Sequence, residues 1–162
     1  MGITRGSLYK AFADKRSLFL AALAHYDRTE VEAAVHVLRD AAAGDGAARI
    51  GRVLQSVVAA VAKRGDRRGC FLCNTAVDQA PHDPEVERVV KAMLRRFDRA
   101  FAEALRATGL AADRTAAELG RIAEGLTTAY LGLRVRAKAG QPPRQLARTV
   151  ATILGEAGLQ AA

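Results

Sequence analysis

The stretch GITRGSLYKAFADKRSLF, residues 2–19, predicts a short helix, a turn and the start of a long helix. Thr4 is a good N-cap, and Leu8 and Phe12 lie four residues apart on one face that can be buried. Gly6 weakens so short a helix by about 1 kcal/mol against alanine, a cost that fits a bulky partner approaching the backbone. Duplex DNA is such a partner. The remaining face offers a cation, a hydroxyl, a phenol and an ammonium group, from Arg5, Ser7, Tyr9 and Lys10.

The start of the long helix carries charges of an unexpected sign. Asp14 is suited to cap this helix, yet Lys15 and Arg16 occupy its first turn. The helix dipole disfavours cations at that end unless an anion shares the site, and a helix N-terminus is a good seat for phosphate. We therefore interpret Lys15 as a phosphate contact.

These residues resemble the TetR family of bacterial transcriptional regulators, in which a recognition helix runs into Ser/Thr-Leu-Tyr-x-x-Phe and a lysine opens the next helix. Ser7, Leu8, Tyr9, Phe12 and Lys15 match that pattern position for position. The resemblance implies an all-α fold with a helix-turn-helix head, and places Lys15 on phosphate. It also implies that five side chains face the major groove or its flanking phosphates: Thr4, Arg5, Ser7, Tyr9 and Lys10.

The sequence departs from the family pattern ahead of this motif. A helix-turn-helix needs a first helix that supports the recognition helix, and almost nothing precedes residue 4. We expect that the gene start was placed too late or that the chain is a fragment, and that it binds specific DNA weakly or not at all. The expected domains are a partial DNA-binding domain at 1–20 and a helical ligand-binding and dimerisation domain at 21–162.

Length and charge set further bounds on the protein. The 162 residues suit one domain, or one domain with an appended fragment, and half of them are apolar. No apolar run approaches a membrane span, and no secretory h-region follows the start, so we expect a cytoplasmic protein without a membrane partner. A net charge of +8 and a pI near 10.2 favour contact with polyanions, although such a field attracts them without specificity.

Apolar residues recur at helical spacing through the rest of the chain. Glycine and proline interrupt the pattern at Gly44–Gly46, Pro81, Gly109 and Gly140, and Asp83 and Thr115 are suited to cap helices. The basic loop 63–69 is interpreted as a surface connection, with a phosphate contact as the alternative. Helices are expected at about 15–42 and 47–63, within 69–81, from 83 to about 108, from 115 to about 139, and from Pro142-Pro143 onward.

Cys70 and Cys73 have the spacing of a zinc or redox pair. A structural zinc needs four ligands, and no further Cys pair or suitably spaced His lies nearby, so we expect no metal and no cofactor, and interpret the pair as small buried side chains. The segment also resembles the Gly-Cys-Phe/Leu-Leu-x-Asn stretch found in the ligand-binding domain of many TetR-like proteins. Asn74 needs polar partners, either backbone in the core or a ligand in a pocket.

Met93, Phe97 and Phe101 recur every four residues, which is typical of core and also compatible with a small-molecule pocket. The expected pocket residues are Cys73, Asn74, Val77, Met93, Phe97, Phe101 and Tyr130.

The last two helices have no later partner in the chain, so we expect a homodimer through a two-fold four-helix interface, as the resemblance also implies. The expected interface residues are Leu126, Leu133, Leu146, Val150, Ile153 and Leu154.

No catalytic arrangement emerges from the sequence, because the three histidines are scattered and no paired carboxylates or phosphate-binding glycine loop occur, so we expect no enzyme. The leading hypothesis is a ligand-responsive DNA-binding transcriptional regulator, a repressor, with operator DNA, a small-molecule effector and a second copy of the chain as partners. The alternative is an N-terminally truncated, dimerising ligand-binding module that cannot bind DNA specifically. A third hypothesis is a thiol enzyme that uses Cys70 and Cys73.

Overall fold

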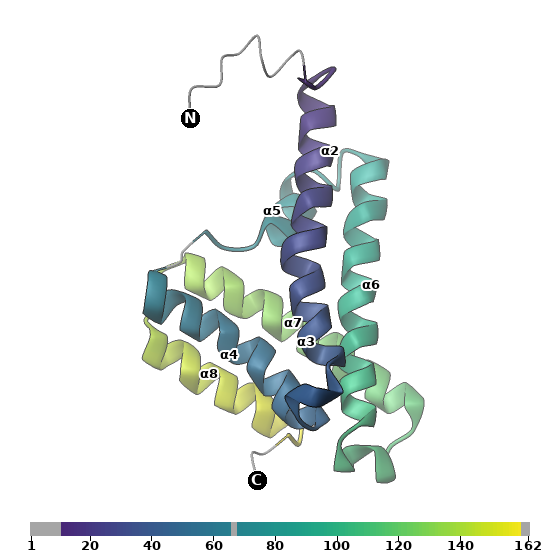
Figure 1. Ribbon diagram of the computed structural model, residues 1–162, viewed down its shortest axis with the longest axis vertical. Coiled ribbons are helices and arrows are strands. Elements are labelled where there is room, and N and C mark those ends of the chain that lie inside the picture. Colours follow the sequence, from purple (N-terminus) through teal and green to yellow (C-terminus); the bar gives the residue numbers. More distant parts are fainter. Residues whose placement is uncertain (1–10, 66–67, 160–162) are drawn as a thin grey trace.

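The computed structural model describes residues 11–65 and 68–159, and every regular element within them is a helix (Figure 1). The expected all-α fold is therefore confirmed. The candidate DNA-contacting residues Thr4, Arg5, Ser7, Tyr9 and Lys10 lie outside the described residues.

The long helix predicted over 15–42 is present but changes its geometry in the middle. It consists of α2 (Lys15–Tyr26), the π-helical segment η1 (Asp27–Val31) and α3 (Glu32–Arg39), followed by the short 3₁₀ turn η2 (Ala41–Ala43). Asp14 caps it by accepting a hydrogen bond from the backbone of Ser17 at 2.6 Å. The regular spacing of apolar residues predicted an α-helix throughout, and no local signal indicated the π segment.

Helix α6 (Pro84–Arg106) runs beside the long helix in the same direction (Figure 1). Asp83 caps it and Pro84 occupies its first turn, as the sequence predicted. Ion pairs hold the two helices in register from end to end, because Arg16 contacts Asp83 near their starts and Arg39 contacts Glu103 near their ends, both at 2.7 Å. The side of α6 that faces the core buries Val86, Val90, Met93, Phe97, Phe101 and Leu105.

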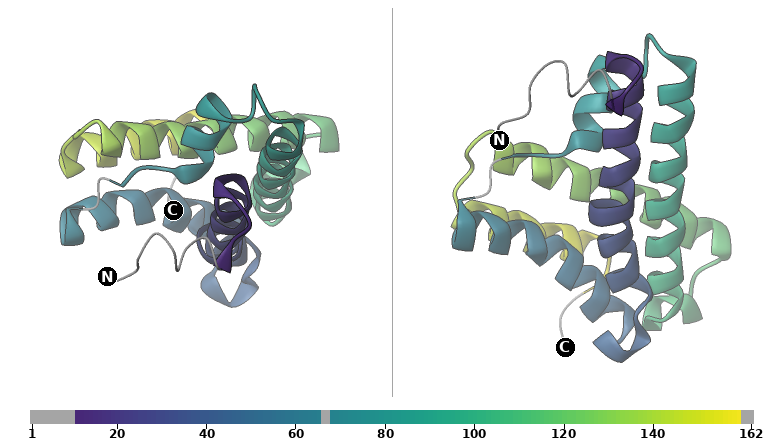
Figure 2. Two further views of the ribbon diagram at one scale, coloured as in Figure 1. Left: turned by 90° about the horizontal axis from the view of Figure 1, so that it is seen from above. Right: turned by 45° about the horizontal axis from the view of Figure 1, so that its top comes forward.

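Three further helices lie crosswise to this pair: α4 (Gly46–Arg64), α7 (Ala116–Lys138) and α8 (Pro143–Glu156) (Figures 1 and 2). Helix α7 packs against α6, and α4 packs against both α7 and α8. The short helix α5 (Phe71–Asp78) contacts α2 and α6, and the 3₁₀ turn η3 (Gly109–Ala112) connects α6 to α7. The apolar side chains between these layers form one continuous core.

Gly46 lies where two helices approach closely. Its N–H donates to the carbonyl oxygen of Ala107 at 3.1 Å, and a Cβ at this position would lie only 1.9 Å from the carbonyl oxygen of Ala104. Glycine is thus required here by the contact between the start of α4 and the end of α6. The sequence analysis identified Gly44–Gly46 only as a helix break.

Within residues 11–65 and 68–159, no helix is both long enough and apolar enough for a membrane crossing.

Candidate functional site

Arg134 is the centre of a polar cluster inside the helical body. Its side chain, on α7, is only 20% exposed. One guanidinium nitrogen, Nη1, donates to the hydroxyl of Tyr130 at 3.1 Å. The other, Nη2, donates to the hydroxyl of Tyr26 at 3.2 Å and to the carbonyl oxygen of Gly69 at 3.0 Å. A single guanidinium therefore joins the end of α2, the residues just before α5 and the second half of α7.

Local structure explains why these groups meet. Tyr130 and Arg134 lie one turn apart on α7, where residues four apart share a face. Tyr26 is the last residue of α2, and Glu30 lies in η1 with its Oε2 3.9 Å from Nη2 of Arg134. Gly69 adopts a positive φ of 81°, which a side chain would strain, and this turns its carbonyl towards α7.

Burial keeps the phenols of this cluster neutral. It raises the pKa of Tyr26 and of Tyr130 above the usual range, while the nearby Arg134 charge opposes that shift. Each neutral hydroxyl accepts a hydrogen bond from Arg134, and the hydroxyl of Tyr26 donates to the sulfur of Cys70 at 3.5 Å. The Nε of Arg134 is buried without a hydrogen-bond partner, so this group retains capacity for an acceptor.

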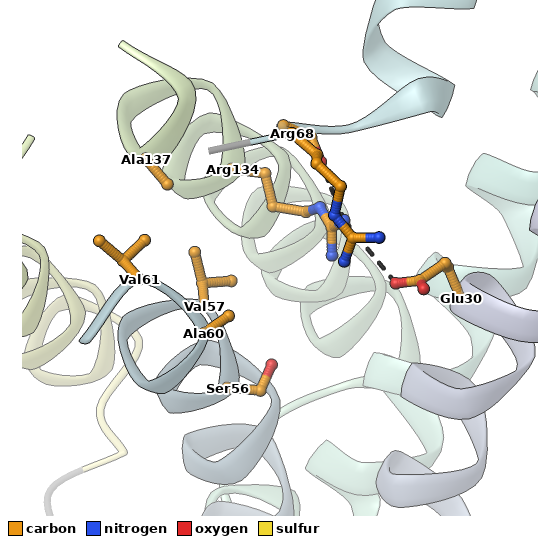
Figure 3. A pocket seen from close by; sticks show the side chains of 9 residues that line it. Glu30, Ser56, Val57, Ala60, Val61, Arg68, Arg134 and Ala137 are labelled. Carbon is orange, nitrogen blue, oxygen red and sulfur yellow. Dashed lines mark hydrogen bonds and ion pairs between the residues drawn. The ribbon is translucent and has the colours of Figure 1, made fainter. Parts of the chain in front are cut away.

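Two cavities adjoin the cluster on its outer side. One has a volume of about 230 Å³ and lies between α4 and α7, with Val57, Ala60 and Val61 on its apolar wall (Figure 3). Arg68, Arg134 and Glu30 form its polar side, and Figure 3 shows the two arginines directed towards Glu30. The cavity thus combines an apolar wall with charged groups that converge on its polar side.

The second outer cavity, of about 440 Å³, shares Glu30, Arg68, Gly69 and Arg134 with the first and extends along α2 to Ala22 and His25. A third, inner space of about 10 Å³, enough for one water molecule, lies behind them and is bordered by Cys70, Phe97, Tyr130 and Arg134. Residues of the long helix thus line all three spaces.

The structure distributes the expected pocket residues over different places. Asn74 lines the 440 Å³ cavity and accepts from Nζ of Lys138 at 3.5 Å. Phe97 and Tyr130 border the inner space, with ring centroids 5.4 Å apart. Met93 and Phe101 are buried in the core, and Cys73 is half-buried. Val77 is 74% exposed and lies outside the cavities described above.

Sequence reasoning missed Arg134, Tyr26 and Glu30, which line more than one of these cavities. A signal for Arg134 was present, because an arginine one turn after Tyr130 on a largely apolar helix needs buried partners. Tyr26 and Glu30 carried no comparable signal, since their role depends on how the long helix packs against α7.

Cys70 is buried at the N-cap position of α5, where its side chain makes no capping hydrogen bond, and Cys73 occupies the third position of that helix. Both are free cysteines. In the described part of the chain, no cluster of three or more His, Cys, Asp or Glu side chains is placed to hold a metal ion.

At the start of α2, Lys15 and Arg16 have different surroundings. Arg16 donates to Asp83 and Glu85, each at 2.7 Å, so carboxylates at the start of α6 offset its unfavourable position on the dipole of α2. Lys15 is exposed in the same turn. Of the residues expected to contact DNA, Lys15 is the one within the described part of the chain.

The residues expected at a dimer interface fall into two groups. Leu126, Leu133, Leu146 and Val150 are almost fully buried within the single chain, and Ile153 and Leu154 are half-buried beside them. A shallow cavity of about 250 Å³ lies between α7 and α8, lined by Ile122, Gly125, Leu126, Ala129, Ile153, Glu156 and Ala157. Leu126 and Ile153 are the members of the expected interface set that line this cavity.

Comparison with known proteins gives three findings. Residues 46–149 match the family described as "Transcriptional regulator LmrA/YxaF-like, C-terminal domain". The HTH-type transcriptional regulator YezE of Bacillus subtilis (strain 168) is 34% identical over 101 residues, which are 62% of this chain and 51% of that protein. The chain thus spans about half the length of this curated relative.

Among solved structures, the chain is similar to the TetR family transcriptional regulator CifR, determined as a cysteine mutant complexed with 26 bp double-strand operator DNA. The TM-score is 0.77 at 28% sequence identity, over 94% of this chain and 80% of that one.

Proposed function

This chain belongs to the TetR family of transcriptional regulators, and from that premise we propose that it is a ligand-responsive repressor whose effector binds in the cavities around Arg134. One observation carries the proposal: the cavity walls include Tyr26 and Glu30, which lie on the same long helix that begins at Lys15. In this proposal residues 1–20 belong to the DNA-binding domain and residues 21–162 form the ligand-binding and dimerisation domain.

The long helix supplies the proposed connection between effector and DNA. From Lys15 to Glu30 it spans roughly 22 Å at 1.5 Å per residue, so a tilt imposed beside Arg134 displaces the Lys15 end. On the resemblance to the family, the operator contacts are Thr4, Arg5, Ser7, Tyr9, Lys10 and Lys15. Because coupling between two binding sites is reciprocal, the effector and the operator weaken each other's binding to the same degree.

The chemistry of the cavities favours an effector with an apolar body and more than one polar group, since Glu30, Arg68 and Arg134 line both outer cavities. Val57, Ala60 and Val61 offer apolar surface for the body. Arg134 also lines this cavity, so its guanidinium offers N–H donors to a bound molecule. The effector group that meets Arg134 would therefore be a hydrogen-bond acceptor such as a carbonyl or carboxylate oxygen.

Effector binding in the 230 Å³ cavity is tested with a variant whose side chain fills it. A library of small organic compounds is screened against the chain by thermal shift, and each hit is measured again on Val61→Trp, where the larger side chain occupies the 230 Å³ cavity. We expect hits to lose at least about tenfold in affinity on Val61→Trp, since the space for their apolar body is gone. Val77→Trp is the matched control, because Val77 is 74% exposed away from the cavities and this variant should bind as the parent chain does. Equal binding to both variants contradicts the assignment.

DNA binding is tested with the chain on duplexes selected from a random-sequence pool. An enriched sequence that the compound hits release, and that Lys15→Ala binds more weakly, supports the regulator. If no sequence is enriched while the hits still bind the cavity, the alternative holds, and the chain is a dimerising ligand-binding module that cannot bind DNA specifically.

A further inference from the structure

The Cys70–Cys73 pair has no part in the proposed function, although it lies beside the central cluster. Cys70 is the N-cap of α5 and Cys73 is its third helical residue. A separation of three residues across the first turn of a helix places two Cα atoms roughly 5 Å apart. That separation lies within the roughly 4.4–6.8 Å that disulfides bridge. The backbone therefore holds the two cysteines at a distance suitable for bonding.

The surroundings of Cys70 favour its thiolate. The thiol of Cys73 and the hydroxyl of Tyr26 both donate to the Cys70 sulfur, the latter at 3.5 Å, and the Arg134 guanidinium is bonded to the same phenol. These hydrogen bonds, with the Arg134 charge, lower the pKa of Cys70 below the usual thiol range despite its burial. The Cys70 hydrogen bond and burial raise the pKa of Cys73. Cys70 is thus favoured as a nucleophilic thiolate, while Cys73 stays a protonated thiol.

We propose that Cys70 and Cys73 form a peroxide-sensitive dithiol, in which Cys70 reacts with hydrogen peroxide and Cys73 closes an intramolecular disulfide. The space bordered by Cys70 is small, about 10 Å³, and Cys70 is only 3% exposed. Hydrogen peroxide, with two oxygen atoms, is the smallest peroxide, whereas hydroperoxides with a bulky organic group are far too large for a space of this size. The site therefore selects its oxidant by size.

The two steps balance in atoms and electrons. The Cys70 thiolate attacks one oxygen of hydrogen peroxide, an S–O bond forms, the O–O bond breaks, and the departing hydroxide takes up a proton as water. Cys70 is oxidised by two electrons to the sulfenic acid while the peroxide is reduced. Cys73 then loses its proton and attacks the Cys70 sulfur. The S–S bond forms, the S–O bond breaks, and hydroxide leaves with that proton as a second water.

Oxidation would act on the long helix through Tyr26. This residue joins α2 to the π segment η1, and its hydroxyl donates to the Cys70 sulfur. A disulfide sulfur carries no negative charge and accepts hydrogen bonds poorly, so the contact between Tyr26 and Cys70 is lost on oxidation. The dithiol state is thereby linked to the junction at which the long helix changes geometry.

The test follows the thiols of the full chain during exposure to hydrogen peroxide, without DNA or effector. We expect the intact mass to fall by two hydrogen atoms per chain, and dithiothreitol to reverse the change. Cys73→Ser should stop at the sulfenic acid, which dimedone traps. Cys70→Ser should react at least about tenfold more slowly, because the activated thiolate is absent. Cumene hydroperoxide should react far more slowly than hydrogen peroxide with the parent chain.

Tyr26→Phe separates activation from simple exposure of the sulfur. It keeps the ring but removes the hydrogen bond, so the Cys70 pKa measured by ultraviolet thiolate absorbance should rise, and oxidation at neutral pH should slow. Circular dichroism confirms that each variant is folded. Oxidation of Cys70→Ser at the parent rate, disulfides formed only between chains, or an unchanged Cys70 pKa in Tyr26→Phe would overturn the proposal.

Discussion

Arg134 shows how much of this protein depends on a single side chain. It hydrogen-bonds two phenols and a backbone carbonyl from three separate segments, and it lines each of the three spaces described around it. A lysine could not replace it, since an ammonium cannot donate in one plane to several fixed acceptors. The candidate site therefore depends on the geometry of the guanidinium as well as on its charge.

Gly46 provides a stability prediction at the same scale. Gly46→Ala should lower the free energy of unfolding by roughly 1–3 kcal/mol, because the new Cβ would collide with the Ala104 carbonyl oxygen and force α4 away from α6. Denaturant unfolding followed by circular dichroism measures the change.

Gly51→Ala is the matched control within α4, where the nearest atom to an added Cβ is Cδ1 of Leu154 at 4.0 Å. This substitution should raise stability by about 1 kcal/mol, since alanine favours helix over glycine. Equal effects of the two substitutions would contradict the close approach at Gly46.

At the scale of elements, the long helix and α6 are joined by ion pairs along their length. Besides the pairs at the two ends, Arg96 of α6 contacts Asp27, the first residue of the π segment, at 2.5 Å, and also Glu32, which directly follows the segment. Such π segments occur frequently at functional sites, and this one carries Glu30 on its cavity side. The pairs hold the π segment against α6 from one side while Arg134 contacts it from the other.

The pair at the start of the two helices predicts a pH dependence. The Arg16 guanidinium lowers the pKa of Asp83 from its usual value of 3.8 to about 2. A lowered pKa in the folded state means that the carboxylate stabilises the fold above pH 3.8, and that this contribution disappears as the pH falls through about 2. The melting temperature of the parent chain should therefore exceed that of Asp83→Asn near neutral pH, and the gap should close between about pH 4 and pH 2.

Arg16→Gln is the control for this prediction. It removes the ion pair but leaves the Asp83 carboxylate free to cap α6 through the backbone of Glu85 and Val86. Its melting temperature should lie below that of the parent chain near neutral pH and converge with it in acid. A gap that stays constant with pH in both variants would show that the pair does not stabilise the fold.

At the scale of the whole molecule, we predict a homodimer through the outer face of α7 and α8. Gly125 lies on that face, and an added Cβ meets nothing within 4 Å in the single chain. Gly125→Arg should therefore leave the protomer folded and make it monomeric, because a charge would be buried in the interface. Light scattering coupled to gel filtration measures the mass, with Val77→Arg as a dimeric control. A monomeric parent chain would contradict the prediction.

Most of the helices could be predicted from the sequence. Asp14, Asp83 and Thr115 were recognised as caps, and the structure shows each accepting the backbone hydrogen bonds that start a helix. Glycine and proline marked the breaks to within a few residues. These signals involve residues within one helical turn of each other, so they can be identified in the sequence without knowledge of the fold.

The packing of the helices against one another could not be predicted from such local signals. Leu126, Leu133, Leu146 and Val150 have the apolar spacing of an interface, yet they are buried within the single chain. The same spacing serves a core or an interface, and only the neighbouring helix decides which. Phe97 borders the inner space while Met93, one turn earlier, does not, which periodicity also cannot distinguish.

The sequence by itself determined an all-helical chain, the caps and breaks of its helices, and the resemblance that the comparisons bear out, because these properties reside in short runs of neighbouring residues. Only the tertiary structure decided that Tyr26, Gly69 and Arg134 meet beside two cavities, and that the long helix carries a π segment there. Residues 26 and 134 are separated by most of the chain, so their contact follows from how α2 and α7 pack and leaves no local pattern.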